Sequence, residues 1–130
     1  MLANLLLVFL IGSDALIDRH VVRDCAGANL DQALIACSRI IDVMPHSVRQ
    51  VAVAYLYRGR AEYFKREFER AVGDYSKAIA IDPRLAPAFS ERGSSYLSLH
   101  RFDLAISDCT QAIKINPNNA VYRYNCGNAY

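Results

Sequence analysis

The sequence of 130 residues predicts an all-α protein built from consecutive helix-turn-helix units. Residues 52–85 are repeated as residues 86–119 at an offset of 34, which is the period of a helical hairpin repeat. Within each copy, small and apolar residues recur every three or four positions over two stretches, as they do on the buried face of a helix. Pro83 or Pro117 then ends each copy, because proline cannot continue the second helix.

The two copies agree at positions where side-chain size decides packing. Gly59 and Gly93 lack a Cβ, so we expect a neighbouring helix to approach closely at both. A third copy begins at Ala120 and repeats this glycine as Gly127. The remaining matched pairs are Ala52 and Ala86, Ala54 and Ala88, Phe68 and Phe102, Ala71 and Ala105, Asp74 and Asp108, Ala78 and Ala112, and Ile81 and Ile115.

This set of residues resembles the tetratricopeptide repeat family. The resemblance rests on Gly59, Phe68, Ala71, Tyr75, Ala78 and Pro83 in one copy and on Gly93, Tyr96, Phe102, Ala105, Ala112 and Pro117 in the next. Glu62, which stands where later copies have tyrosine, and Cys109, which replaces the aromatic Tyr75, depart from the pattern. The resemblance implies a right-handed superhelical solenoid of antiparallel helix-turn-helix hairpins, with the first helix of each copy lining a concave face.

Five segments are expected along the chain: an apolar segment at 1–15, a degenerate repeat with a linker at 16–51, two repeats at 52–85 and 86–119, and the first helix of a truncated repeat at 120–130. Residues 1–15 suit a signal peptide or a short hydrophobic anchor, which would make the protein periplasmic or secreted. No basic residue precedes the apolar run, so a buried helix or a start at an internal methionine, with a cytoplasmic protein, is the alternative.

The degenerate repeat is expected to have a first helix at 15–26 and a second helix at 34–43 that ends at Pro45. Between Pro45 and Ala52 the chain carries about four residues more than the regular spacing needs. Ser47 can act as the N-cap of a longer first helix. A wider linker is the alternative.

The four cysteines are candidates for disulfides, and their even number fits an oxidising compartment. Cys109 and Cys126 lie at similar distances from the turn at 116–119, so a disulfide and two buried thiols are both consistent with the sequence. Cys25 and Cys37 flank the turn at Gly27 unequally, which predicts an axial offset of several ångströms unless the hairpin is distorted. We nevertheless favour a disulfide there. No histidine or second cysteine stands at metal-ligand spacing, so no metal site is predicted.

The concave face is the predicted binding site, and an extended peptide or a helix could lie on it. Aromatic edges would supply contact area, while Arg60 and the asparagines would supply hydrogen bonds. The alternative for Tyr57, Tyr63 and Tyr124 is packing against neighbouring helices. By the resemblance, the face would show Val53, Leu56, Tyr57, Arg60, Tyr63 and Phe64, then Pro87, Ser90, Glu91, Ser94, Leu97 and Ser98, then Val121, Tyr124, Asn125 and Asn128.

Some members of the family grip a C-terminal carboxylate in this groove with a set of Lys, Arg and Asn residues. Here Leu56 and Ser90 stand where lysines would help, so the resemblance does not predict that ligand.

No group of residues predicts catalysis or a cofactor. The three histidines fall in different segments, and we expect the acidic residues to be single and exposed. Asp74 and Asp108 recur at the same position, which predicts a structural bond to a neighbouring arginine. The net charge of +2 and its mixed pattern argue against nucleic acid.

The predicted function is a non-catalytic scaffold that binds a peptide or protein segment in the groove. The alternative is the repeat module of a larger enzyme whose catalytic part lies beyond residue 130. A third hypothesis is self-association through the last helix, on which Tyr124, Cys126 and Tyr130 would form an uncovered face.

Overall fold

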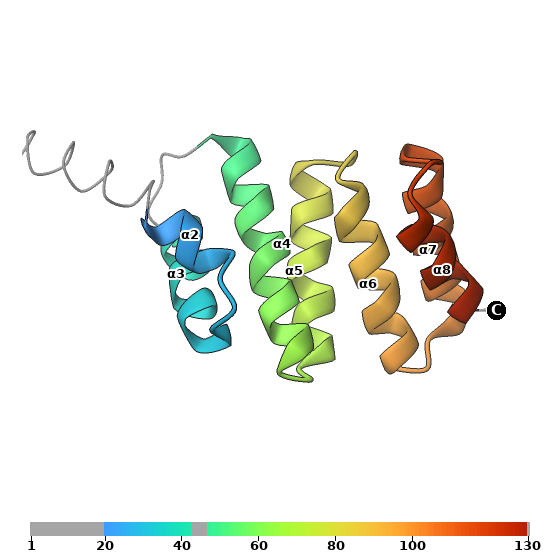
Figure 1. Cartoon of the computed structure of the whole chain (residues 1–130), viewed down its shortest axis with the longest axis horizontal. Coiled ribbons are helices and arrows are strands. Elements are labelled where there is room, and N and C mark those ends of the chain that lie inside the picture. Colours follow the sequence, from blue (N-terminus) through green and yellow to red (C-terminus); the bar gives the residue numbers. More distant parts are fainter. Residues whose placement is uncertain (1–19, 43–46, 130) are drawn as a thin grey trace, which may run out of the picture.

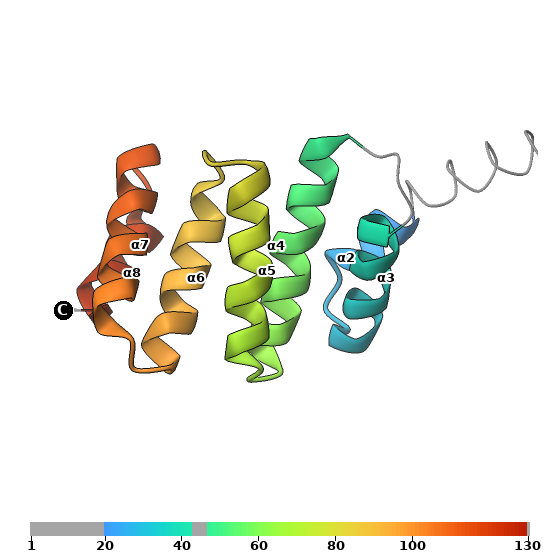
Figure 2. The same cartoon turned by 180° about the vertical axis from the view of Figure 1, so that it is seen from behind.

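A computed structural model of the chain describes residues 20–42 and 47–129. Helices stand side by side in one row, and the chain runs from one end of the row to the other (Figures 1 and 2). No strand occurs within these residues, so the predicted all-α fold is confirmed. The helices are α2 (Val22–Cys25), α3 (Leu30–Asp42), α4 (Val48–Phe64), α5 (Phe68–Ile81), α6 (Ala86–Ser98), α7 (Phe102–Ile115) and α8 (Ala120–Ala129).

The apolar segment at 1–15 lies outside the described residues. Among the helices of the described ranges, none has the length and apolar character that crossing a membrane requires.

Successive helices pair as hairpins, and the hairpins stack. Helix α4 packs on α5 and α6 packs on α7, as the two matched copies predict. The first helices also contact one another, α2 with α4, α4 with α6, and α6 with α8. One side of the row is therefore formed by the first helix of each hairpin, which is the side that the sequence predicts to bind.

The two repeated glycines lie at close helix contacts. A Cβ at Gly59 would lie 2.9 Å from the ring of Tyr75, and a Cβ at Gly93 would lie 3.3 Å from the carbonyl oxygen of Ala105. Tyr75 is 1% exposed and fills the space above Gly59. Close approach explains why both positions lack a side chain, because the packed interior leaves no room for one.

Helix α4 is the longer first helix that Ser47 predicts. The hydroxyl of Ser47 accepts a hydrogen bond from the Gln50 amide at 3.2 Å, and the Gln50 side-chain oxygen accepts one from the Ser47 amide at 3.1 Å. This reciprocal capping box satisfies two amide groups at the helix start. It fixes where α4 begins.

The N-terminal hairpin departs from the predicted boundaries. Helix α2 covers Val22–Cys25, and α3 begins at Leu30 rather than near residue 34. The favoured disulfide between Cys25 and Cys37 is present, with 4.8 Å between the Cα atoms, so this hairpin departs from the regular geometry that would have offset them. The four-residue α2 ends at Cys25, which brings that cysteine beside α3.

Candidate functional site

Two arginines on first helices form ion pairs with buried aspartates on second helices. Arg58 Nε lies 2.6 Å from Asp74 Oδ2, and Arg92 Nε lies 2.7 Å from Asp108 Oδ2. In each pair a second guanidinium nitrogen binds the other carboxylate oxygen. The predicted bond from a repeated aspartate to a neighbouring arginine is therefore confirmed.

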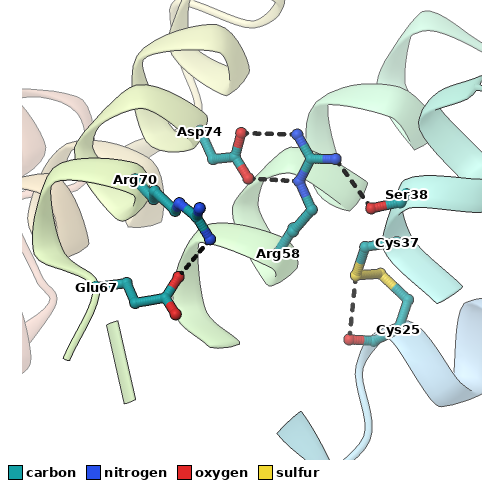
Figure 3. A network of polar contacts seen from close by, with 7 residues as sticks. All are labelled: Cys25, Cys37, Ser38, Arg58, Glu67, Arg70 and Asp74. Atoms are coloured by element: carbon teal, nitrogen blue, oxygen red, sulfur yellow. Dashed lines mark hydrogen bonds and ion pairs between the residues drawn. A yellow bond between two sulfur atoms is a disulfide. The ribbon is translucent and has the colours of Figure 1, made fainter. Parts of the chain in front are cut away.

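Each arginine also reaches back to the preceding hairpin. Arg58 donates to the Ser38 hydroxyl of α3 at 3.0 Å, as Figure 3 shows, and Arg92 donates to the Ser76 hydroxyl of α5 at 3.0 Å. One guanidinium thus joins three helices. We call the two sets the Arg58 network (Ser38, Arg58 and Asp74) and the Arg92 network (Ser76, Arg92 and Asp108).

The expectation that acidic residues are exposed is wrong for three of them. Asp74 is 4% exposed, Asp108 5% and Glu62 8%. The two aspartates are buried because an arginine compensates their charge, whereas Glu62 Oε2 has no hydrogen-bond partner. Burial, with the neighbouring Asp74 charge second, raises the pKa of Glu62 to about 7.

The side of the row formed by first helices carries a hollow of about 220 Å³. Arg60, Tyr63 and Phe64 of α4 line one wall, and Glu91 and Ser94 of α6 line the other. Tyr75 of α5 completes the lining.

An ion pair crosses this hollow. Arg60 Nε donates to Glu91 Oε2 at 3.1 Å, and its Nη2 binds the other carboxylate oxygen. The Arg60 guanidinium also lies 5.1 Å from the centre of the Tyr57 ring. This hydrogen-bonded pairing with Glu91 raises the pKa of Arg60, so the guanidinium stays charged.

A second hollow of about 500 Å³ adjoins the first, and the two share Arg60 and Phe64. Helix α4 and the turn between α2 and α3 enclose it. Apart from Arg60, its lining carries no charge. The residues that line it are Cys25, Ala26, Gly27, Ala28, Leu30, Ala33, Tyr57, Arg60, Ala61 and Phe64. We call the two adjoining hollows the groove.

The tetratricopeptide repeat family matches this sequence at residues 86–119, which are α6, α7 and the turn after them. Solved tetratricopeptide domains share the fold. The OM64 domain of Arabidopsis superposes with a TM-score of 0.71 at 24% identity, over 77% of this chain and 79% of that domain. The described residues therefore have the tetratricopeptide fold. No curated protein matches its sequence.

Two other similar tetratricopeptide domains were solved with peptides bound. The first domain of Spaghetti (RPAP3) binds the HSP90 peptide SRMEEVD, and it matches with a TM-score of 0.70 at 22% identity over 77% of this chain and 76% of its own. The second domain of human RPAP3 binds the HSP70 peptide SGPTIEEVD, and it matches with a TM-score of 0.70 at 21% identity, over 77% and 80%.

Of the predicted groove residues, four on α4 and two on α6 line the hollows. Arg60, Tyr63, Phe64, Glu91 and Ser94 line the smaller one, and Tyr57 lines the larger. Phe64 is 63% exposed, so its ring is free to contact another molecule. Tyr57 and Tyr63 are half-buried against the core, so packing accounts for part of each ring.

Two predicted groove residues have structural roles instead. Leu56 is 6% exposed and packs against Ala71 and Tyr75, because the helix turns it toward α5. Ser90 is 2% exposed, and its hydroxyl accepts a hydrogen bond from Asn125 at 2.9 Å. Both side chains are therefore part of helix contacts.

The remaining predicted positions flank the hollows without lining them. Asn125 is held by its bond to Ser90, while Tyr124 is 70% exposed and Asn128 is exposed. The others, Val53, Pro87, Leu97 and Ser98, are half-buried, and Val121 is exposed.

The uncovered face predicted for the last helix contains Tyr124 but not Cys126. Cys126 is 7% exposed and bonded to Cys109, with 5.3 Å between the two Cα atoms. Tyr122, which the sequence did not single out, is buried in its place and packs with Ala86 and Ala112. Tyr130 lies outside the described residues.

Sequence reasoning missed two features of the site. The first is the ion pair between Arg60 and Glu91 across the smaller hollow. These two residues are 31 positions apart in the sequence, and only the stacking of hairpins brings them together. Glu62 was noted as a departure from the repeat. Its burial could have been found from that signal, since the equivalent Tyr96 is half-buried.

Proposed function

We propose that this protein is a non-catalytic scaffold that binds a peptide or protein segment along the groove. The observation that carries the proposal is a pair of hollows on the side formed by the first helices, both lined by Arg60 and Phe64. Adjoining hollows lined from three hairpins suit an elongated ligand, because a chain segment can contact each hairpin in turn.

The peptide-bound neighbours support the proposal. Two tetratricopeptide domains with the same fold bind short peptides. The charged groups also support it. Of the described residues that line the groove, Glu91 is the one carboxylate, and it is bound by Arg60, so no unpaired acid stands beside a base in that lining.

The two disulfides support work in an oxidising compartment, where such bonds persist. This agrees with an exported protein.

Site-specific photo-crosslinking in the producing cell tests where a partner binds. A benzophenone amino acid replaces Ser94, which lines the groove, and in a matched variant it replaces Ser107, which is exposed on α7. We expect discrete adducts from position 94 only. The same adducts from both positions, or none from position 94, would contradict binding in the groove.

A second substitution tests whether the groove itself holds the crosslinked partner. Phe64→Ala in the Ser94 crosslinking variant removes an exposed ring from the groove and should weaken the adduct. Phe102→Ala is the matched control, because Phe102 is 52% exposed but lies at the turn between α6 and α7.

A further inference from the structure

The charged side chains around the groove are compensated within the chain. Arg60 pairs with Glu91 across the smaller hollow. At the edge of the larger one, Lys65 binds Asp31, which joins the end of α4 to the start of α3. A charged ligand would have to break one of these pairs, and the gain from its own charge would be offset by the charge it leaves unpaired.

The Arg60 pair is the one that matters most, because it crosses the smaller hollow and Arg60 also lines the larger one. Its side chains are 39% and 26% exposed, so the pair is partly removed from water. Both carboxylate oxygens of Glu91 are bound by the guanidinium. The Tyr57 ring lies beside the same guanidinium, 5.1 Å from ring centre to guanidinium carbon.

The larger hollow is suited to an apolar side chain. Its volume of about 500 Å³ lies within the range of roughly 300 to 1,000 Å³ that is usual for ligand pockets. Alanines and a glycine form much of its wall, which leaves room, and the rings of Tyr57 and Phe64 supply contact area. The Cys25–Cys37 disulfide fixes the turn between α2 and α3 that closes the hollow.

We propose that the groove selects an uncharged polypeptide segment and seats one large aliphatic or aromatic side chain of that segment in the larger hollow, between the α2–α3 turn and α4. The compensated ion pairs and the apolar lining together carry this inference. It rests on the proposed function, since it names the chemistry of the ligand for the same groove. It also sets this groove apart from the neighbours, whose bound peptides contain glutamate and aspartate.

Selection from a phage library of random short peptides on the oxidised full chain tests the ligand chemistry. Peptides enriched by the wild type should contain one large apolar residue and fewer charged residues than the starting library. They should bind Phe64→Ala about tenfold more weakly, the loss expected for an exposed aromatic contact, and bind the Phe102→Ala control as they bind the wild type.

The possible outcomes distinguish a failure of this inference from a failure of the proposed function. Enrichment of acidic or basic peptides that still depend on Phe64 overturns the inference and leaves groove binding standing. Enrichment that is insensitive to Phe64→Ala, or none at all, overturns both.

A second variant tests directly whether the ion pair with Glu91 keeps Arg60 from binding an acidic ligand. Glu91→Gln keeps the shape of the side chain and removes its charge, so the guanidinium becomes available to an anion. Binding of the acidic peptide SRMEEVD, measured by fluorescence anisotropy, should rise at least about tenfold over the wild type. Equal binding by the wild type and Glu91→Gln would show that the pair does not exclude acidic ligands, and it would overturn the inference.

Discussion

The middle of the described helix row and its two outer hairpins are held together by different chemistry. In the middle, the Arg58 network (Figure 3) and the Arg92 network each join three helices through one guanidinium. At the outer positions, Cys25–Cys37 joins α2 to α3, and Cys109–Cys126 joins α7 to α8.

The Cys109–Cys126 disulfide occupies the place of an arginine network in the repeat. Cys126 stands one 34-residue period after Arg92, which itself stands one period after Arg58. The disulfide therefore replaces the arginine that would have joined α8 to the preceding hairpin. Of the α8 side chains that the structure describes, only Tyr122 and Cys126 are buried. A helix with so little buried surface gains most from a covalent link, whereas an inner helix that is packed on both sides can be aligned by polar contacts.

The largest expected effect comes from removing the outer covalent link. Replacing both Cys109 and Cys126 with serine should lower the opening free energy of α8 by about 3 kcal/mol, which is typical for a disulfide closing a loop of this size. Hydrogen exchange should show α8 unprotected while α5 keeps its protection. The matched control is the double serine variant of Cys25 and Cys37, which should leave α8 unchanged. Full protection of α8 without its disulfide would contradict the comparison.

Breaking an inner network should have nearly as large an effect, but it should lower the free energy of unfolding of the whole domain. Asp108→Ala leaves Arg92, whose side chain is 19% exposed, without its carboxylate. We expect a loss of about 3 kcal/mol in urea unfolding, the cost of leaving a largely buried charge unpaired. Asp103→Ala, at an exposed position of the same helix, should change stability by less than about 0.5 kcal/mol. Equal effects of the two variants would mean that the network contributes nothing.

The two networks also differ, because Glu62 lies beside the first. Its position in the repeat corresponds to Tyr96, so only the Arg58 network has a second carboxyl group nearby. At neutral pH, loss of the carboxylate in Asp74→Ala leaves Glu62 available to Arg58, and this variant should lose less stability than Asp108→Ala.

Glu62→Gln should change the pH dependence of stability. The pKa of Glu62 is raised to about 7 in the folded protein, above the ordinary value of 4.5, so the folded state holds the proton more tightly than the unfolded state. The protonated Glu62 carboxyl therefore contributes to folding stability below about pH 4.5, and this contribution is lost as the pH rises through about 7. The variant should be more stable than the wild type at pH 8 by about 3 kcal/mol, and nearly equal near pH 4.5. A difference in the free energy of unfolding that stayed the same at every pH would contradict the raised pKa of Glu62.

Alanine at two glycines should give the smallest effects, with opposite signs. Gly59→Ala places a Cβ 2.9 Å from the buried Tyr75 ring and should destabilise by about 1 kcal/mol. Gly73→Ala meets nothing within 4 Å and should stabilise α5 by about 0.5 to 1 kcal/mol. Thermal unfolding of both variants checks the pair. A stabilising Gly59→Ala would show that the Tyr75 contact does not limit the inner packing.

Much of the fold could be predicted because the repeat pattern is local. Helix boundaries from Val48 onward follow from periodicity, the Ser47 cap and the two prolines. The candidate site was only partly predictable. Of the residues predicted for the groove, Arg60, Phe64 and Ser94 line the hollows, whereas Leu56 and Ser90 are buried in helix contacts. Helical phase alone does not say how far a neighbouring hairpin covers a side chain.

The sequence by itself determined the all-α class, the 34-residue period, the need for small residues at Gly59 and Gly93, and the bond from each repeated aspartate to an arginine. These follow from steric and charge requirements that recur at fixed spacing. Tertiary structure alone decided the groove with its Arg60–Glu91 pair, the burial of Glu62 and the short distance between Cys25 and Cys37. Each depends on the rotation of one helix against another, which no spacing within a single helix specifies.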